Sequence, residues 1–334
     1  MKNIKTHILI LGSGVGGLSA ACWTKKLKQD FLVVESSEKL PMNLHNGVHY
    51  LHTIPKFPFE IKIKSITLTD GIMDEYGNIR HNWTLDDILE YSEKVREVQH
   101  PTSIMDIGKR ISVFMPESND MNNLIKEMYE YSGTKNYLFG QLIRKIDIGN
   151  KIVYTDNESI TYDYLISTLP LDFFEKFFGL KNEYKSSPIF ITNFSVDRIV
   201  PNWLINIYIP SKRTSIYRFS ILNGRVSVES SGGFANNKDL DFFLRKFFVL
   251  KNTKKEFEWK IGKVISIDRD KRLKLIELFK KYDCFSLGRF GLWNRKLLMD
   301  STINQAYLIA NHIYGDRSEN TEEDWNKIKI ELTK

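Results

Sequence analysis

The N-terminal part of the chain predicts a strand, a helix and a second strand from its pattern of apolar and polar positions. The apolar run His7–Leu11 is typical of a buried strand. Apolar residues at helical spacing follow between Leu18 and Leu27, and a second apolar run, Phe31–Val34, predicts another buried strand. The order strand, helix, strand indicates a βαβ unit with parallel strands.

Farther along the chain, changes in the hydrophobic period mark further elements. Alternation predicts strands over residues 55–69, and a capping box of Thr84 and Asp87 starts a helix that we expect to end near residue 98. A β-meander with asparagine turns is expected near the middle of the chain. The meander strands are expected at 137–148, 151–155 and 159–167. Around the meander we expect helices at 121–131, 240–250 and 269–282 and strands at 188–209, 215–230 and 284–289. A last helix is expected to be capped by Asp300 and to end near 315.

A glycine motif connects the first strand to the first helix. Gly12, Gly14 and Gly17 form a G-x-G-x-x-G, and Glu35 follows the second strand. Gly12 permits the tight turn, Gly14 lets a pyrophosphate approach the backbone, and Gly17 allows the helix to pack closely on the strand. The helix N-terminus attracts phosphates, and Glu35 accepts hydrogen bonds from a ribose 2′-hydroxyl. An acid at this position argues against a 2′-phosphate, so the motif predicts a dinucleotide other than NADP.

Length and composition set the broad class. The 334 residues are enough for about two domains, and the hydrophobic fraction of 42% is ordinary for a globular protein. No apolar run is long enough for a membrane span, and no signal peptide precedes the nucleotide motif. The two cysteines, Cys22 and Cys284, are far apart, which argues against a disulfide framework and fits a cytoplasmic protein.

The net charge of +7 is concentrated in one segment. Residues 245–283 contain 13 Lys and Arg against 6 Asp and Glu, so this segment alone carries +7. Such a segment can be a solvated face, or it can attract an anionic partner such as a nucleotide sugar or a nucleic acid. No nucleic-acid-binding motif accompanies the charge.

Three histidines fall within eight residues, at His45, His49 and His52. Histidines at i and i+3 bind one metal ion only on a helix, and the glycine and proline around them argue against a helix. No cysteine cluster supports such a site either. We therefore expect no metal here, and a strand or turn that lines a pocket.

Taken together, five segments resemble the FAD-binding family that includes amine oxidases, protoporphyrinogen oxidase and UDP-galactopyranose mutase. They are the glycine motif with Glu35, Gly47–Thr53 (GVHYLHT), Tyr162–Pro170 (YDYLISTLP), Glu258–Gly262 (EWKIG) and Gly288–Asp300 (GRFGLWNRKLLMD). The first and the last are specific together. The resemblance implies an α/β protein with a Rossmann-like FAD-binding domain, a parallel sheet plus a β-meander, and a smaller, discontinuous α+β substrate domain.

The resemblance also implies domain boundaries and roles for single residues. The FAD-binding domain is expected at residues 1–55, 110–175 and 264–318, the substrate domain at 56–109 and 176–263, and a C-terminal tail at 319–334. The residues expected to contact FAD are Gly12, Gly14, Gly16, Gly17, Glu35, Ser36, Arg289, Met299 and Asp300. Arg289 would reach the pyrophosphate, and the backbone N–H groups of Met299 and Asp300 would face the pyrimidine edge of the flavin. His49, His52, Tyr217 and Arg218 are the candidate catalytic residues of the wall opposite the flavin.

Three departures from the family separate the candidate functions. Pro41-Met42 replaces a Gly-Gly pair, Leu297-Leu298 replaces the Tyr-Asp pair with which the mutases contact their substrate, and the segment 55–113 is too short for the mutase helical domain. The leading hypothesis is therefore an FAD-dependent oxidoreductase that oxidises a C–N or C–O bond of a small or nucleotide-linked substrate by hydride transfer to flavin N5. The alternatives are a mutase-like, redox-neutral flavoenzyme acting on a nucleotide sugar, in which Arg218 binds a substrate phosphate, and a non-enzymatic nucleotide-binding protein.

Overall fold

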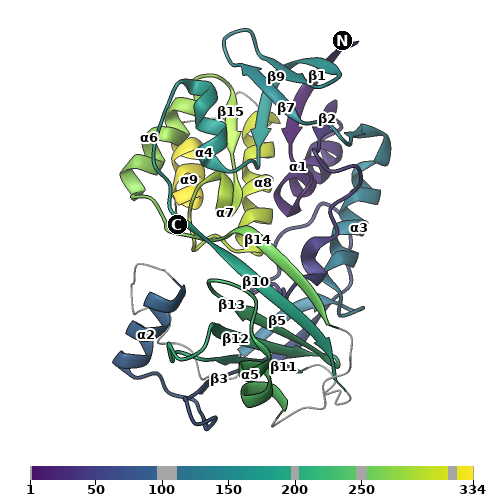
Figure 1. Cartoon of the computed structure of the whole chain (residues 1–334). Helices are drawn as coiled ribbons and strands as arrows, with labels where there is room; N and C mark the ends of the chain where they lie inside the picture. Colours follow the sequence, from purple (N-terminus) through teal and green to yellow (C-terminus); the bar gives the residue numbers. More distant parts are fainter. Residues whose placement is uncertain (1, 96–110, 197–202, 246–253, 315–321, 334) are drawn as a thin grey trace.

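Two β-sheets organise the chain, and each is built from segments that are far apart in the sequence (Figure 1). The computed structural model describes residues 2–95, 111–196, 203–245, 254–314 and 322–333. The predicted fold class is confirmed, because a mostly parallel sheet with a meander is joined to a second, largely antiparallel sheet.

The first sheet is parallel at its centre. Strand β1 pairs with β2 on one side and with β9 on the other, β6 extends the sheet beyond β2, and β15 pairs in parallel with the second half of β9. The antiparallel strands β7 and β8 form the meander that leads into β9. The bounds are β1 (Lys2–Leu11), β2 (Phe31–Val34), β6 (Tyr137–Leu138), β7 (Ile143–Asp147), β8 (Ile152–Thr155), β9 (Glu158–Ser167) and β15 (Cys284–Ser286).

Helices cover both faces of this sheet, as the continuous apolar runs of β1 and β2 require. Ile8 and Ile10 of β1 pack toward α1, α3 and α8, whereas Leu9 and Leu11 pack toward α4 and α6. The helices are α1 (Val15–Lys26), α3 (Met121–Ser132), α4 (Leu171–Phe174), α6 (Arg269–Lys280), α7 (Gly288–Gly291), α8 (Met299–Tyr314) and α9 (Glu322–Thr333), with short turns η1 (Asn43–His45), η3 (Thr134–Asn136) and η4 (Glu175–Phe178).

The second sheet has strand order β14-β10-β13-β12-β11-β3-β4, and β5 also pairs with β3. The bounds are β3 (Ile63–Met73), β4 (Ile79–Arg80), β5 (Ile111–Pro116), β10 (Ser186–Ser195), β11 (Trp203–Tyr208), β12 (Ile216–Leu222), β13 (Arg225–Ser230) and β14 (Lys255–Val264). One face of this sheet packs against α5 (Asn237–Leu240) and the π-turn η5 (Asp241–Arg245). On the other face, Ile66, Leu68, Leu204 and Leu222 join the hydrophobic core of the first sheet, so the two sheets share one core.

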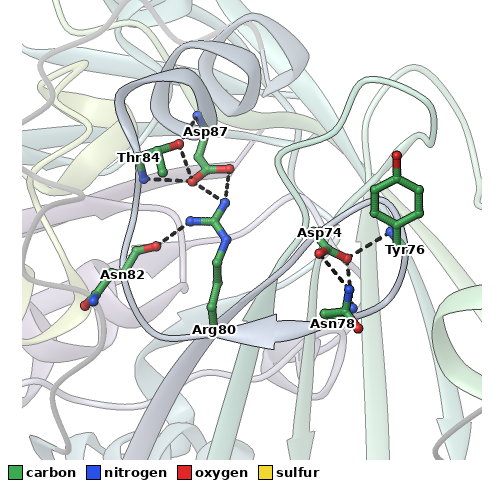
Figure 2. A network of polar contacts seen from close by, with 7 residues as sticks. All are labelled: Asp74, Tyr76, Asn78, Arg80, Asn82, Thr84 and Asp87. Atoms are coloured by element: carbon green, nitrogen blue, oxygen red, sulfur yellow. Dashed lines mark hydrogen bonds and ion pairs between the residues drawn. The ribbon is translucent and has the colours of Figure 1, made fainter.

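Helix α2 (Leu85–Val95) stands at the end of the second sheet, and Figure 2 shows how its start is fixed. The Thr84 N–H donates to the carboxylate of Asp87 (2.7 Å), and the Asp87 N–H donates to the Thr84 hydroxyl (3.2 Å). The predicted capping box is thus confirmed. Arg80 of β4 donates to the same carboxylate and to the carbonyl of Asn82, which ties the β3–β4 hairpin to the helix.

Several predicted boundaries are wrong. Strand β3 begins only at Ile63, so Phe57, Phe59 and Ile61 lie in the connection before it and owe their apolar character to packing against the shared core. The predicted strand at 137–148 is two strands, of which β6 joins the parallel edge of the first sheet. Residues 96–98, 197–202 and 246–250 of other predicted elements lie outside the described residues.

The C-terminal end of the chain is part of the fold and not a tail. Residues 319–334 contain α9, which packs against α6 and α8. Trp325, Ile328 and Leu332 lie on one face of α9 and are buried in the shared core, as their spacing along a helix allows. The predicted tail is therefore wrong, while the other predicted domain boundaries stay predictions.

The basic segment 245–283 contributes partly to the fold. Arg272 is only 4% exposed, and its guanidinium donates to the carbonyls of Leu292, Thr333 and Ile267. It thereby fixes α6 to α9 and to the loop before α8. Part of the charge of this segment is thus structural, and its binding to an anionic partner stays a prediction.

Candidate cofactor and substrate site

The loops that follow four parallel strands meet at one edge of the first sheet. The Gly12 N–H donates to the carbonyl of Val34 (2.8 Å), and Thr168 donates from its N–H and its hydroxyl to the carbonyl of Leu11 (3.0 and 2.8 Å). The Leu287 N–H donates to the carbonyl of Ser167 (3.1 Å). This edge is the carboxyl end of the sheet, where α/β proteins bind nucleotides.

The three glycines of the motif differ in what surrounds them. Gly12 has a φ of +95°, and a Cβ there would lie 2.4 Å from the hydroxyl oxygen of Thr168. A Cβ at Gly17 would lie 1.8 Å from the carbonyl oxygen of Gly12, so close packing of helix on strand requires glycine. A Cβ at Gly14 would meet no atom within 4 Å. The space beside Gly14 is therefore open, as the pyrophosphate prediction requires.

Gly16 has a packing role, and its predicted contact with the cofactor stays a prediction. A Cβ there would lie 2.5 Å from a methyl group of Leu287 and 3.2 Å from the methyl group of Thr302, in the first turn of α8. Gly16 thus allows the N-termini of α1 and α8 to approach each other, and contact with the cofactor is not needed to explain it. The first and the last segments of the resemblance meet here.

Glu35 and Ser36 lie directly after β2, and the carboxylate of Glu35 is 8% exposed. It accepts hydrogen bonds from the N–H and the hydroxyl of Ser13 (2.8 and 2.9 Å) and from the N–H of Ser37 (2.9 Å). Burial alone would raise the pKa of this carboxyl, but the hydrogen bonds from Ser37 and Ser13 outweigh burial and lower it. Glu35 is therefore ionised and attached to the glycine loop, and its contact with a ribose stays a prediction.

The start of α8 holds a buried carboxylate. Asp300 is the second residue of the helix and not its predicted N-cap. One oxygen, Oδ2, accepts from the N–H and the hydroxyl of Thr53 (3.1 and 2.7 Å), which joins the segments Gly47–Thr53 and Gly288–Asp300 of the resemblance. The other oxygen, Oδ1, is buried and has no hydrogen-bond partner in the described part of the chain.

Arg289 and His52 lie beside this carboxylate. The Arg289 Nε donates to the carbonyl of Leu297 (3.1 Å), which orients the side chain along the loop before Met299. Burial and the positive charge of Arg289 lower the pKa of His52, while the negative charge of Asp300 opposes them. These groups surround the first turn of α8, whose N–H groups lack acceptors within the helix.

The residues at this edge fit a dinucleotide. The open space at Gly14 and the converging N-termini of α1 and α8 are features that the phosphates of such a ligand would occupy, whereas the unpartnered oxygen of Asp300 needs a donor, such as a hydroxyl group of the dinucleotide. Because Gly12 and Gly17 tolerate no side chain, the loop is also held in the shape that the motif requires.

The segment Gly47–Thr53 passes from this edge onto the second sheet. The Tyr50 hydroxyl lies 3.5 Å from the amide nitrogen of Asn206 on β11, and the ring of His49 lies 6.0 Å from that of Trp259 on β14. Burial lowers the pKa of His49 to about 4, against the opposing effect of the negative charge of Glu229. His49 is therefore neutral at physiological pH.

The sheet face beneath this segment carries a row of buried polar side chains, here called the polar row. It crosses five strands in register, since each member is the direct partner of the next. The Ser220 hydroxyl donates to Asn206 (2.7 Å), and the Ser227 hydroxyl donates to Asn193 (2.5 Å). The members are Asp70, Asn206, Ser220, Ser227 and Asn193.

Tyr217 and Arg218 lie beside the polar row, and both bind Glu229. The Arg218 guanidinium donates to one carboxylate oxygen through Nε (3.1 Å) and also through a terminal nitrogen, and the Tyr217 hydroxyl donates to the other oxygen (2.7 Å). Burial would raise the pKa of Glu229, but the charge of Arg218 and these hydrogen bonds outweigh it and lower the pKa. The positive charge of Arg218 is therefore balanced within the protein.

A cavity of about 200 Å³ opens beside His49, between the loop, the start of α3 and the β12–β13 turn. Its lining is half apolar and half polar: Leu44, Val48, Met115, Met121 and Leu222 on one hand, and His49, Asn119, Asp120, Asn223 and Arg225 on the other. A larger hollow of about 460 Å³ lies between the meander and α6 and contains none of the predicted site residues.

The structure thus brings the predicted residues into two groups. The glycines, Glu35, Ser36, Arg289, Met299 and Asp300 belong to the carboxyl edge, with His52 next to them, while His49, Tyr217 and Arg218 belong to the face of the second sheet. Sequence patterns give no sign of Asp70 and Glu229, because their importance depends on the register between strands. The alternating apolar positions of β3 put Asp70 on the buried face, whereas β13 is buried from Val226 to Ser230 and gives no such signal for Glu229.

Among the described residues, no group of three His, Cys, Asp or Glu side chains is arranged to hold a metal ion. In the same ranges, no helix is both long and apolar enough to cross a bilayer.

The fold and the site define a class, that of proteins with a dinucleotide-binding α/β domain joined to a second, sheet-based domain. No protein-family model and no curated protein matches the sequence. Solved structures do match. A reduced UDP-galactopyranose mutase aligns over 95% of this chain and 95% of its own, with a TM-score of 0.69 and 16% identity.

Two other solved structures extend the comparison. A putative protoporphyrinogen oxidase from Exiguobacterium sp. 255-15 matches 94% of this chain and 98% of its own, with a TM-score of 0.64 and 10% identity. Klebsiella pneumoniae HpxO, in complex with FAD and uric acid, matches 99% of this chain and 84% of its own, with a TM-score of 0.56 and 12% identity. These likenesses fit the flavoprotein resemblance, and at such identities they show the fold.

Proposed function

We propose that the protein is an FAD-dependent oxidoreductase that oxidises a C–N or C–O bond of a small substrate. The observation that carries this proposal is the convergence of the N-termini of α1 and α8 beside the open space at Gly14. Two helix N-termini and a glycine loop at the carboxyl edge suit the pyrophosphate of a dinucleotide. The likeness to HpxO, which was solved with FAD, supports FAD as that dinucleotide.

The residues of the carboxyl edge would hold the cofactor. Gly12, Gly14 and Gly17 shape the pyrophosphate site, Glu35 serves the ribose, and the first N–H groups of α8 face the flavin. When bound, the flavin would supply the acceptor for a hydride, and the protein supplies orientation and electrostatics. Arg289 approaches the same edge from α7.

The face of the second sheet would supply the substrate wall. His49 is neutral and lies between the cavity and Glu229, so it can accept a proton or a hydrogen bond from a substrate. Tyr217 and Arg218 are committed to Glu229, which makes them positioning residues rather than direct contacts. His52, beside Asp300, lies nearer to the cofactor edge.

Two observations favour an oxidoreductase over a mutase acting on a nucleotide sugar. The charge of Arg218, which a mutase would use for a phosphate, is already balanced by Glu229. The cavity beside His49, about 200 Å³, is smaller than the roughly 300–1,000 Å³ of typical pockets for drug-sized ligands. Both observations suit a small substrate without a diphosphate.

The test is an absorbance spectrum of the purified protein, taken before and after incubation with FAD, then after dithionite and air. Oxidised-flavin bands are expected, and rapid reoxidation in air would lead to a screen of small amines and alcohols. Slow reoxidation together with conversion of UDP-sugars by the reduced form would replace the proposal by the mutase. A protein that binds no flavin even after FAD is added would contradict both functions.

A further inference from the structure

The face of the second sheet that carries the polar row, here called the substrate face, holds two buried acids that positive charges do not compensate equally. Arg218 and Glu229 form a buried ion pair, and Lys263 lies over the ring of Tyr217 at 4.7 Å. Asp70, two strands along the sheet from Arg218, is a second buried acid on the same face and is only 7% exposed. The positive charges of Arg218 and Lys263 both lower the pKa of Glu229, whereas burial raises the pKa of Asp70 against the smaller effects of a hydrogen bond from Asn206 and of the charge of Arg218.

Asp70 is also incompletely satisfied by hydrogen bonds. Its Oδ1 is buried and has no hydrogen-bond partner in the described ranges. Asn206 accepts from the Ser220 hydroxyl and also forms a side-chain hydrogen bond with Asp70, so the row ends in a carboxylate of which one oxygen, Oδ1, lacks a donor. A buried carboxylate oxygen without a donor is costly, and a group that binds there and supplies a donor would remove that cost.

The surroundings of Asp70 connect it to the segment Gly47–Thr53. Its strand partner Asn206 approaches the hydroxyl of Tyr50, in the segment that also carries His49 and His52. Beyond the effect of burial, the charge of Asp70 contributes to the raised pKa values of Tyr50 and Tyr208. Asp70 therefore lies between the segment Gly47–Thr53 and the aromatic side chains that pack against α2.

We propose that Asp70 determines the substrate class of this face, by binding the N–H group of a small, positively charged amine. The inference rests on the proposed function, since it concerns the same substrate face. An anion would find its counter-charge, Arg218, already engaged, whereas a cation would pair with Asp70 and supply the missing donor. A neutral alcohol would supply a donor but no charge.

The test compares three ligands of similar size and shape: protonated isobutylamine, isobutanol and isobutyrate. Their binding to the FAD-reconstituted protein is measured at neutral pH, by flavin difference spectra and, independently of flavin, by calorimetry. The wild type should bind the amine at least about tenfold more tightly than the alcohol or the acid. In Asp70→Asn, which keeps the shape but removes the charge, the preference should disappear while the affinity for the alcohol stays unchanged.

The matched control is Asp74→Asn, because Asp74 lies four residues along in the exposed β3–β4 turn and accepts only local hydrogen bonds. It should leave the preference for the amine intact. Equal or tighter binding of isobutyrate, an unchanged preference in Asp70→Asn, or no binding of any of the three ligands would overturn the inference. Because calorimetry does not need flavin, failure to bind FAD would contradict the proposed function alone.

Discussion

At the scale of single residues, a substitution at Gly14 tests cofactor binding without disturbing the fold. Its backbone is extended, with φ of −69° and ψ of −175°, which any residue can adopt, and no atom lies within 4 Å of its missing Cβ. Gly14→Val should therefore fold normally but lose FAD, because the valine side chain would occupy the place of the pyrophosphate. The measurement is the ratio of flavin to protein absorbance, with circular dichroism to confirm folding.

Gly17, three residues after Gly14, provides the contrast. A Cβ at Gly17 would lie 1.8 Å from the carbonyl oxygen of Gly12, so Gly17→Ala should destabilise the protein itself. A Gly14→Val protein that keeps a full complement of FAD would show that this loop does not bind the pyrophosphate. Equal loss of folding in both variants would show that Gly14 is structural.

His49 gives the second prediction at this scale, and it concerns pH. Its folded-state pKa is about 4, below the ordinary value of 6.5, chiefly because of burial. Between these values the unfolded chain binds a proton that the folded chain does not, so stability falls as the pH is lowered from 6.5 toward 4. His49→Gln should remove about 1–3 kcal/mol of this loss.

The measurement for His49 is urea denaturation at several pH values between 4 and 7, with His81→Gln as the control for losing a histidine elsewhere. The advantage of His49→Gln should grow as the pH falls and be absent near pH 7. Parallel curves for the wild type and His49→Gln would show that His49 is not buried in its neutral form.

At the scale of elements, α2 depends on its first turn. Asp87 completes the capping box with Thr84 and also binds Arg80 of the hairpin. Asp87→Ala should therefore cost about 1–2 kcal/mol of stability, from the lost cap and a half-exposed ion pair. Chemical denaturation measures the cost, and Asp86→Ala, one residue away and outside the capping box, should change stability by less than about 0.5 kcal/mol.

The elements also show what the sequence can and cannot predict. The βαβ unit, the meander and the capping box could be predicted because each has a local cause: an apolar period, a glycine turn or a cap. The start of β3 could not, since Phe57 and Phe59 alternate like strand residues but pack without sheet partners. The polar row and the Arg218–Glu229 pair could not either, because they depend on pairing between strands that are distant in the sequence.

At the scale of the whole molecule, the shared core joins what the sequence predicts as two domains. Leu68, Leu204 and Leu222 of the second sheet pack in the same buried cluster as Ile8 and Ile10 of the first. Burial of one such side chain stabilises by about 1.5–3 kcal/mol, so the interface alone can couple the two sheets strongly. The face of the second sheet is thus held against the carboxyl edge of the first, as the proposed hydride transfer over a short distance would require.

This coupling predicts that the chain unfolds as one unit and that FAD stabilises all of it. Tryptophan fluorescence, which reports on both sheets through Trp259 and Trp293, and flavin release should show coincident thermal transitions. Excess FAD at about a hundred times its dissociation constant should raise the stability by about 2.7 kcal/mol and move both transitions together. A transition of the second sheet that FAD leaves in place would show instead that the sheets unfold separately, and the substrate face would then not be rigidly coupled to the cofactor edge.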